Sequence, residues 1–304
     1  MRNKWSPKLA PDQTGRVAIV TGANTGLGFE TARALAEKGA QVIMACRDAK
    51  RAESARQEIL SQLPSAQITV ELIDTGSQDS VRHFATNFQQ AHSRLDLLIN
   101  NAGIMITPYF QTADGFEGQL GVNYLGHFLL TGLLLPMLTA TPGSRVVSLY
   151  SLAADWHGVQ FDDLQFKEKY DATKAYSQSK QACLMFGLEL NQRLQAAGNN
   201  TIALAAHPGY SKSDLSRHLS LPIRWMLAIF GPLILQPTAD GALPTLYAAL
   251  DNDLKGGEAV GPAGRKQTRG APVVVPVNEQ AQDAAARSRL WSLSEELCGI
   301  SYVF

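Results

Sequence analysis

Tyr176 and Lys180 are the two residues of this sequence whose types and spacing most directly suggest chemistry. Residues four apart in a helix lie on one face, so the phenol and the ammonium group can reach the same small molecule. A phenol has an unperturbed pKa of ~10, and a nearby cation lowers that pKa. The pair therefore predicts a tyrosine that exchanges protons near neutral pH, with Lys180 as the neighbouring cation.

A second pair, Tyr170 and Lys174, has the same spacing earlier in the chain. Asp171 is of a residue type that starts helices, and the apolar periodicity begins after it. The pattern predicts a helix over 174–194, with Tyr170 before its start. Tyr176 is therefore the predicted active residue.

Ser151 follows the apolar run 145–149, which predicts a strand. Ligands of parallel sheets bind at the carboxyl ends of strands, where a hydroxyl can hold the oxygen of a substrate carbonyl. Ser148 lies inside the strand, and we expect a structural role for it. Asn123 falls in an apolar helical stretch, where a buried amide needs partners. The alternative for Asn123 is a structural role, in which backbone groups of the core satisfy the hydrogen bonds of its amide.

The run TGANTGLG, from Thr21 to Gly28, follows an apolar strand and precedes a helix. It places Gly22, Gly26 and Gly28 where the backbone must turn tightly and approach a ligand. Free N–H groups and the positive end of the helix dipole favour a pyrophosphate there. An ordinary glycine turn is the alternative, but the flanking strand and helix favour a nucleotide.

Arg47 stands at the end of the second apolar strand, where strand–turn–helix units that bind NAD usually present an acidic residue. A guanidinium can pair with a 2′-phosphate through charge-assisted hydrogen bonds, and Cys46 carries no charge to oppose it. Arg47 therefore predicts NADP(H) as the cofactor. The adjacent Asp48 could neutralise the guanidinium, in which case the specificity would be mixed.

Short apolar runs rich in β-branched residues alternate with stretches in which apolar residues recur every three or four positions. This alternation predicts an α/β fold with a doubly wound parallel sheet and helices on both faces. No linker divides the chain, so we expect one domain over 1–304. The predicted strands are 17–20, 42–45, 68–73, 95–99, 145–149, 201–206 and one near 256–261, and the predicted helices are 27–37, 49–63, 80–91, 116–138 and 174–194.

The TGxxxGxG turn and the Ser151, Tyr176 and Lys180 spacing together resemble the short-chain dehydrogenase/reductase family over nearly the whole chain. The resemblance implies a Rossmann fold of about seven strands and hydride transfer between a nicotinamide and a carbonyl or alcohol. It also implies a catalytic tetrad. In it Tyr176 donates the proton, Ser151 holds the carbonyl oxygen, Lys180 binds the ribose and lowers the tyrosine pKa, and Asn123 holds a water of the proton relay.

The same resemblance assigns cofactor contacts to residues that follow the strands. Asp74 and its neighbour would contact the adenine, the Asn-Ala-Gly stretch after the fourth strand would line the groove, and Ser213 stands where a threonine often bonds the carboxamide. The PG turn after the sixth strand would lie beside the nicotinamide. The implied cofactor residues are Gly22, Asn24, Thr25, Gly26, Leu27, Gly28, Arg47, Asp74, Thr75, Asn101, Ala102, Gly103, Tyr176, Lys180, Pro208, Gly209, Ser211 and Ser213.

The segment 221–235 is the most hydrophobic part of the chain, but it is shorter than the ~20 residues that span a bilayer. By resemblance it belongs to a substrate lid over about 211–240. Its apolar character suggests an apolar substrate; a contact between copies of the chain and shallow membrane association are alternatives. A C-terminal extension over about 265–304 contains a predicted amphipathic helix at 287–297.

Weaker similarities point to one branch of the family. The strand end ACRD at 45–48, the Ser-Leu-Ala after the fifth strand and the tail resemble the retinol dehydrogenase and protochlorophyllide reductase-like branch. Retinal and other apolar aldehydes or ketones are therefore candidate substrates, with NADPH favouring reduction.

The composition indicates a globular protein that acts on small molecules. Basic and acidic residues both number 27, and a net charge of zero argues against nucleic-acid binding. The three widely spaced cysteines predict neither disulfides nor a metal site. The basic start is not followed by a long apolar run, so we expect a cytoplasmic protein without a signal peptide or transmembrane segment, in contact with a membrane at most peripherally.

Two histidines are also candidates for the site. We expect His207 to serve packing, while His157 could face the substrate.

Two other functions are alternatives to hydride transfer. A catalytically silent NADP(H)-binding regulator would lack a tetrad residue, and none is missing. An epimerase or dehydratase of the extended branch would have a TGxxGxxG turn and a larger carboxyl-terminal domain, and neither is present.

Overall fold

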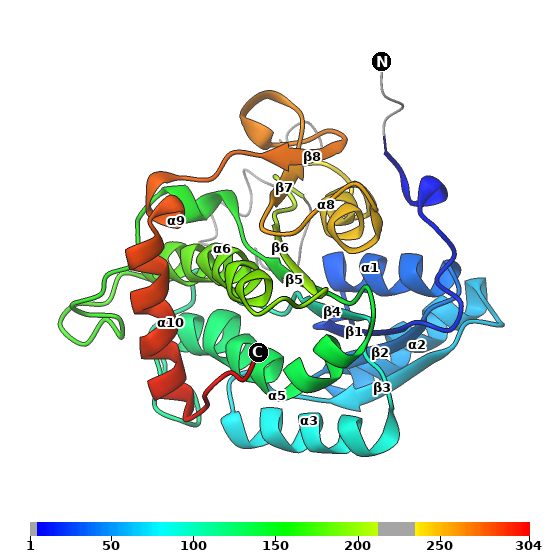
Figure 1. Ribbon diagram of the computed structural model, residues 1–304, viewed down its shortest axis with the longest axis horizontal. Helices are drawn as coiled ribbons and strands as arrows, with labels where there is room; N and C mark the ends of the chain where they lie inside the picture. Colours follow the sequence, from blue (N-terminus) through cyan, green and yellow to red (C-terminus); the bar gives the residue numbers. More distant parts are fainter. Residues whose placement is uncertain (1–4, 212–234) are drawn as a thin grey trace.

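The computed structural model describes residues 5–211 and 235–304. In this part of the chain one eight-stranded sheet has the order β3-β2-β1-β4-β5-β6-β7-β8 (Figure 1). The pairings from β3 to β7 are parallel, and β8 is antiparallel to β7. The strands are β1 Val17–Thr21, β2 Gln41–Cys46, β3 Ile68–Leu72, β4 Leu97–Asn100, β5 Arg145–Leu149, β6 Ile202–Ala206, β7 Ala259–Pro262 and β8 Pro272–Val275.

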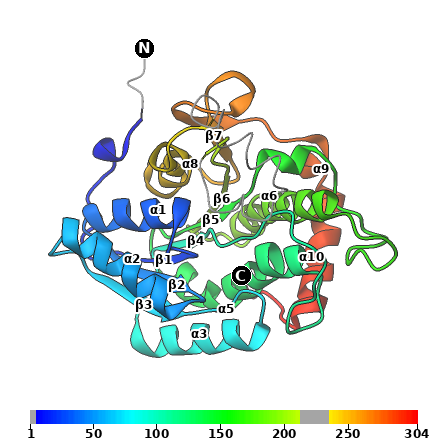
Figure 2. The same cartoon turned by 180° about the vertical axis from the view of Figure 1, so that it is seen from behind.

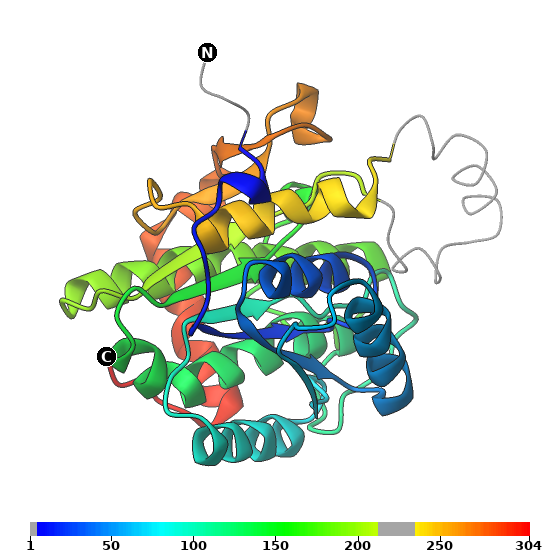
Figure 3. The same ribbon diagram turned by 90° about the vertical axis from the view of Figure 1, so that its right-hand side faces the viewer.

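Helices cover both faces of the sheet, as the alternation predicted (Figures 1 and 2). Helices α1, α2 and α8 pack on one face, and α3, α5 and α6 pack on the other, so that β1, β4 and β5 are buried along their whole length. Figure 3 shows α8 beside α1. The α-helices are α1 Gly26–Glu37, α2 Ala49–Gln62, α3 Gln78–Ala91, α4 Gly118–Leu120, α5 Gly126–Ala140, α6 Ala172–Ala196, α8 Thr238–Leu250, α9 Glu279–Gln282 and α10 Ala284–Cys298; the other helical turns are η1 Pro7–Leu9, η2 Gly121–Leu125, η3 Leu152–Asp155 and η5 Arg265–Gln267.

The far edge of the sheet differs from the seven expected strands. Gly256 and Gly257 have φ of 92° and 79°, so they form a turn, and the seventh strand starts after them. The C-terminal extension then adds β8, which a short connection can return antiparallel to β7. The extension therefore contributes to the sheet itself.

The expected helix 116–138 is divided into three segments. The Glu117 carboxylate accepts the N–H groups of Gln119 and Leu120, which starts the helix at α4. The π-helical segment η2 follows and holds Asn123, and α5 continues from it. Gly118–Ala140 is long and apolar enough to cross a membrane, but 78% of its most apolar window is buried inside the protein, as in a core helix.

The predicted tail helix is confirmed as α10, and it packs on the outer side of α5 and α6 (Figure 2). Trp291 of α10 is buried against Phe128, and the hydroxyl of Tyr302 donates to the Phe128 carbonyl at 2.6 Å. The Arg287 guanidinium lies 3.2 Å from the buried carboxylate of Glu189 on α6. The tail is thus held by apolar burial and by a charged contact.

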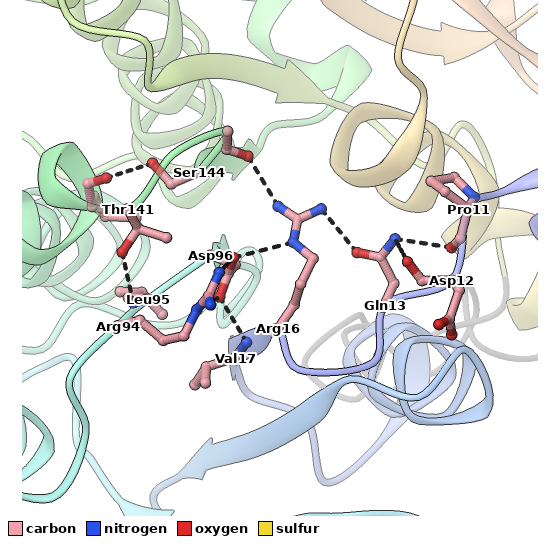
Figure 4. A network of polar contacts seen from close by, with 12 residues as sticks. Pro11, Asp12, Gln13, Arg16, Val17, Arg94, Leu95, Asp96, Thr141 and Ser144 are labelled. Carbon is pink, nitrogen blue, oxygen red and sulfur yellow. Dashed lines mark hydrogen bonds and ion pairs between the residues drawn. The ribbon is translucent and has the colours of Figure 1, made fainter.

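Asp96, directly before β4, anchors the amino-terminal edge of the sheet (Figure 4). Its carboxylate is 1% exposed and accepts hydrogen bonds from Arg94 at 2.7 and 2.8 Å, from Arg16 at 3.2 Å and from the Val17 backbone at 2.9 Å. Burial alone would raise the pKa of Asp96, but the hydrogen bonds and the two guanidinium charges outweigh it and hold the pKa below its usual range.

We expect Asp96→Asn to lower the free energy of unfolding by about 2 kcal/mol at neutral pH, because two cations lose a buried partner. A depressed folded pKa adds stability that is complete above the unfolded pKa of ~3.9 and is lost as pH falls through the folded value. Urea denaturation should therefore show the difference from wild type shrinking below about pH 4. Asp162→Asn, which removes an exposed carboxylate 3.7 Å from Arg289, is the control and should change little. Equal losses from both variants would contradict the assignment.

Candidate active site

The start of α6 separates the two tyrosine–lysine pairs. Asp171 caps the helix, because its carboxylate accepts the N–H groups of Thr173 at 2.9 Å and Lys174 at 3.0 Å. Tyr170 consequently lies before the helix, and its hydroxyl donates to the Thr107 carbonyl at 2.9 Å. The expected position of Tyr170 is confirmed, and its hydroxyl has a structural contact.

Tyr176 and Lys180 lie on the buried side of α6, with exposed fractions of 4% and 5%. The Lys180 ammonium donates to the carbonyl of Leu149, the last residue of β5, at 3.2 Å. A Cβ on Gly103 would lie 3.3 Å from Lys180 Nζ and 3.2 Å from Asn123 Oδ1. Gly103, Asn123 and Lys180 therefore meet where β4 and β5 end.

Ser151 joins this group, and Ser148 does not. Ser151 hydrogen-bonds Tyr176, and its Oγ accepts the N–H of Ala153 at 3.2 Å, which starts the turn η3 after β5. The Ser148 hydroxyl donates to the Cys183 carbonyl at 3.0 Å in the interior. The structure thus places the two serines as expected, one at the site and one in the core.

The Asn123 side chain is fully engaged by the protein. Its Oδ1 accepts the Ile104 N–H at 2.8 Å, and its Nδ2 donates to the Ile104 carbonyl at 3.0 Å and to Ser179 Oγ at 2.9 Å. The side chain therefore anchors the loop after β4, as in the core-asparagine alternative. A part for Asn123 in a proton relay remains a prediction.

Burial, and not Lys180, dominates the protonation of Tyr176. Desolvation raises the pKa of Tyr176 to about 12, and the hydrogen bond with Ser151 opposes that rise. Desolvation also lowers the pKa of Lys180. Desolvation thus outweighs the expected lowering of the tyrosine pKa by Lys180.

The glycine-rich turn has room for a phosphate. Gly26 has a φ of 59°, and a Cβ built on it would meet no atom within 4 Å, so the residue borders open space at the start of α1. Gly22 has a φ of 65°, and a Cβ on Gly28 would collide with the Gly22 carbonyl. The turn therefore combines close packing of α1 with an open face of backbone at a helix N-terminus, which fits a pyrophosphate.

Cys46 supports this turn from below, a role that was not expected from the sequence. Backbone groups of Ala23 and Asn24 hydrogen-bond its thiol, and burial raises the pKa of Cys46 to about 11. The Gly22 N–H donates to the Ala45 carbonyl at 2.8 Å. The end of β2 thereby holds the turn in place.

Arg47 is free to meet a ligand, with 74% of its side chain exposed. Its Nη1 lies 4.0 Å from a carboxylate oxygen of Asp74. Asp48 instead caps α2 by accepting the N–H of Arg51 at 3.0 Å. The acidic neighbour of Arg47 is therefore Asp74, and an exposed contact of this length is weak.

The turns after β3 and β4 are also held by close contacts at the carboxyl edge of the sheet. The Asn101 amide donates to the Thr21 carbonyl at 2.7 Å, and a Cβ on Gly22 would lie 3.0 Å from the Ala102 Cα, so the turns after β1 and β4 touch. The Thr75 carbonyl packs against Gly126, where a Cβ would not fit. The predicted residues after β1, β3 and β4 thus lie along the carboxyl edge of the sheet.

The PG turn after β6 is held from two sides. The Pro208 carbonyl accepts the Gln236 amide at 2.7 Å, and Gly209 has a φ of 62° and packs against the Thr268 carbonyl. His207 is fully buried and its Nε2 contacts Gln267 at 2.9 Å, which confirms a packing role. His157 is exposed.

Ser211 lies near Leu27 of the glycine-rich run. A Cβ on Gly241 of α8 would contact both residues, so both pack against the first turn of α8. Ser213 and most of the segment 221–235 lie outside the described residues. The described residues contain no cluster of three or more acidic, histidine or cysteine side chains that could hold a metal ion.

Gln119 holds the loop after β4, and sequence reasoning missed this residue. Ile106 has a φ of 49°, and its N–H donates to Gln119 Oε1 at 2.7 Å. The Gln119 amide nitrogen donates to the Tyr170 hydroxyl at 2.9 Å. Sequence spacing carries no signal for this contact, because it depends on how two loops meet.

Comparison with known proteins indicates the same family as the sequence motifs. The family model described as short chain dehydrogenase matches residues 16–222. Retinol dehydrogenase 12 of Homo sapiens is 42% identical over 289 residues, covering 95% of this chain and 88% of that protein. Retinol dehydrogenase 13 of Homo sapiens is 39% identical, with coverage of 94% and 85%.

Solved structures show the same fold. A protein from Mycobacterium paratuberculosis has a TM-score of 0.83 at 41% identity, with coverage of 99% of this chain and 100% of that one. A short chain dehydrogenase from Burkholderia cenocepacia, solved in complex with NADP, has a TM-score of 0.65 at 21% identity, with coverage of 82% and 96%. This chain is therefore an oxidoreductase that belongs to the short-chain dehydrogenase/reductase family, in its retinol dehydrogenase branch.

Proposed function

We propose that this enzyme transfers a hydride between NADP(H) and an apolar aldehyde, ketone or alcohol, with Asn123, Ser151, Tyr176 and Lys180 as its catalytic residues. The observation that carries the proposal is the meeting of the Tyr176 and Ser151 hydroxyls at the end of β5, with the Lys180 ammonium beside Gly103. This arrangement offers a proton donor, an oxygen-binding hydroxyl and a cation to one small molecule.

Each residue has a distinct task in this proposal. A bound nicotinamide would supply or accept the hydride. Tyr176 donates its proton to the substrate's carbonyl oxygen, and Ser151 hydrogen-bonds that oxygen as charge develops on it. Lys180 binds ribose hydroxyls, and Asn123 keeps the loop after β4 in place. A phenol with a pKa of about 12 carries its proton at neutral pH, as the reductive direction requires.

The exposed guanidinium of Arg47 supports NADP(H) over NAD(H). A 2′-phosphate could replace the weak contact with Asp74 by shorter charge-assisted hydrogen bonds. The rest of the cofactor would be held by the residues after β1, β3, β4 and β6 that the family resemblance implies.

Exposed aromatic side chains support an apolar substrate. Tyr109, Trp156 and Tyr210 follow β4, β5 and β6, whose carboxyl ends form the catalytic edge, and they are 47%, 48% and 42% exposed. The named relatives are retinol dehydrogenases, so retinal belongs in the test set. NADPH oxidation should be screened with retinal, aliphatic aldehydes, steroid ketones and quinones. No turnover with any of them would favour a silent cofactor-binding protein.

We expect Tyr176→Phe to lower turnover of the best substrate at least 100-fold, because general acid catalysis contributes roughly 10²- to 10⁴-fold. Tyr170→Phe is the matched control, since it removes a phenol hydroxyl from the same region that serves a loop contact. It should retain most of the turnover. A larger loss from Tyr170→Phe than from Tyr176→Phe would refute the assignment.

Arg47→Glu should raise the Michaelis constant for NADPH by about tenfold or more, because charged hydrogen bonds of ~1.5 to 3 kcal/mol are replaced by repulsion. The constant for NADH should change much less. Lys255→Glu carries the same change of charge in the exposed turn before β7, away from the carboxyl edge, and serves as the control. An unchanged NADPH constant in Arg47→Glu would show that another residue selects the cofactor.

Titration of tyrosine absorbance in the cofactor-free chain tests the protonation of Tyr176. Because burial raises its pKa to about 12, its phenol should keep its proton until the pH exceeds the ordinary tyrosine value of ~10. Wild type and Tyr176→Phe should therefore give the same titration curve up to that pH. A component near neutral pH that disappears in the variant would mean that Lys180 overrides burial.

A further inference from the structure

His127 connects the cofactor turns to the catalytic layer. It lies at the start of α5, is 3% exposed, and is not used in the chemistry proposed above. Its Nδ1 lies 2.9 Å from the Asn123 carbonyl, and its Nε2 lies 2.8 Å from the Thr21 hydroxyl at the end of β1. The ring thus joins the start of α5 to a residue 106 positions earlier in the sequence.

These contacts allow one arrangement of protons. A carbonyl oxygen only accepts, so Nδ1 carries the hydrogen that bonds Asn123. Burial lowers the pKa of His127 to about 4, so the ring is neutral at pH 7 and Nε2 is a bare acceptor. The Thr21 hydroxyl must then donate to Nε2. Its oxygen accepts the N–H groups of Asn101 and Ala102, each at 2.9 Å.

The Thr21 side of this bridge shapes the cofactor groove. Asn101 and Ala102 form the turn after β4, and that turn touches Gly22 of the glycine-rich turn. If the Thr21 hydroxyl lacked a partner for its hydrogen, it would be free to rotate toward the Ile99 carbonyl, 3.3 Å away. The ring nitrogen therefore fixes the direction in which this hydroxyl receives the two N–H groups.

The Asn123 side of the bridge shapes the catalytic layer. The Asn123 carbonyl lies within η2, where Gly126 bonds five residues back to Gly121 and the helix is widened. The same carbonyl accepts the Cys183 thiol of α6 at 3.2 Å, three residues after Lys180. The Cys183 thiol thus ties the widened turn to the helix that carries Tyr176 and Lys180, and His127 holds the carbonyl that accepts this thiol.

We propose that His127 is a positioning residue whose two ring nitrogens act separately: Nε2 sets the cofactor turn through Thr21, and Nδ1 sets the catalytic layer through the Asn123 carbonyl. The proposal rests on the function proposed above. His127 touches neither substrate nor cofactor in it, and its effects pass through the residues that do.

Two substitutions separate the two nitrogens. In His127→Asn the side-chain amide nitrogen can take the place of Nδ1 but does not reach Thr21, and in His127→Gln the side-chain oxygen can take the place of Nε2. His127→Asn should raise the dissociation constant of NADPH about tenfold and change kcat less than about threefold, as expected for one lost hydrogen bond. His127→Gln should show the reverse, with kcat about tenfold lower and nearly unchanged NADPH binding.

The binding arm uses calorimetry with NADPH on the purified full chain, and the turnover arm uses whichever aldehyde of the screen the wild-type chain reduces. Melting temperatures of both variants should be similar, because each loses one buried hydrogen bond. Parallel losses of binding and turnover in both variants, or no loss in either, would overturn the proposal. Failure of the wild-type chain to turn over any carbonyl would instead refute the proposed function.

Nitrogen NMR of the histidine rings gives a test that does not depend on turnover. The cofactor-free wild-type chain should show a ring with hydrogen on Nδ1 and none on Nε2, and that signal should disappear in His127→Gln. Hydrogen on Nε2 of this ring would overturn the proposal on its own. Thr21→Val should weaken NADPH binding as His127→Asn does, and tight binding by Thr21→Val would equally count against it.

Discussion

The hydroxyl of Thr21 is a single group on which three parts of the structure depend. It is buried at the end of β1, the strand that lies between β2 and β4, where the glycine-rich turn, the turn after β4 and the start of α5 converge. An oxygen that accepts two N–H groups and donates to a ring uses its whole hydrogen-bonding capacity. Because an unpaired N–H group away from water is costly, these bonds hold the turn after β4 against the end of β1.

Desolvation decides the charge states on the buried side of α6. Tyr176, Lys180 and Cys183 share one side of α6, and burial disfavours the charged form of each. The result is a phenol that keeps its proton and an ammonium group satisfied by the Leu149 carbonyl. Contacts with a polar ligand at the open edge would change this balance, since they would replace the missing water as partners of the charged forms.

Charged residues serve different purposes at the two edges of the sheet. At the amino edge, Asp96 is buried and bonded by two guanidinium groups, and on the outer helix layer Glu189 contacts both Arg193 and Arg287. At the carboxyl edge, the Arg47 guanidinium is exposed and only weakly paired. Closely paired charges hold strands and the tail together, whereas an exposed one keeps its hydrogen-bonding capacity for a ligand. This division follows from the parallel sheet, whose carboxyl ends face the ligand.

Much of the site could be predicted from local sequence because its signals are local. Asp171 as a helix cap excluded Tyr170, strand position separated Ser151 from Ser148, and the glycine spacing marked the nucleotide turn. These features depend on residues a few positions apart, so hydrophobic periodicity and capping rules detect them.

The remaining features were decided by contacts between distant segments. β8 pairs with the edge of β7, and the helix expected over 116–138 contains the π-helical segment η2, whose Asn123 bonds the loop after β4 and Ser179 of α6. The pKa of Tyr176 rose where the spacing with Lys180 predicted a fall, because burial is a property of the packed core. The sequence alone thus determined which residue types line the carboxyl edge of the sheet. Only the tertiary structure decided the protonation and the hydrogen-bond partners of these residues, because desolvation and long-range hydrogen bonds exist only after the helices have packed on the sheet.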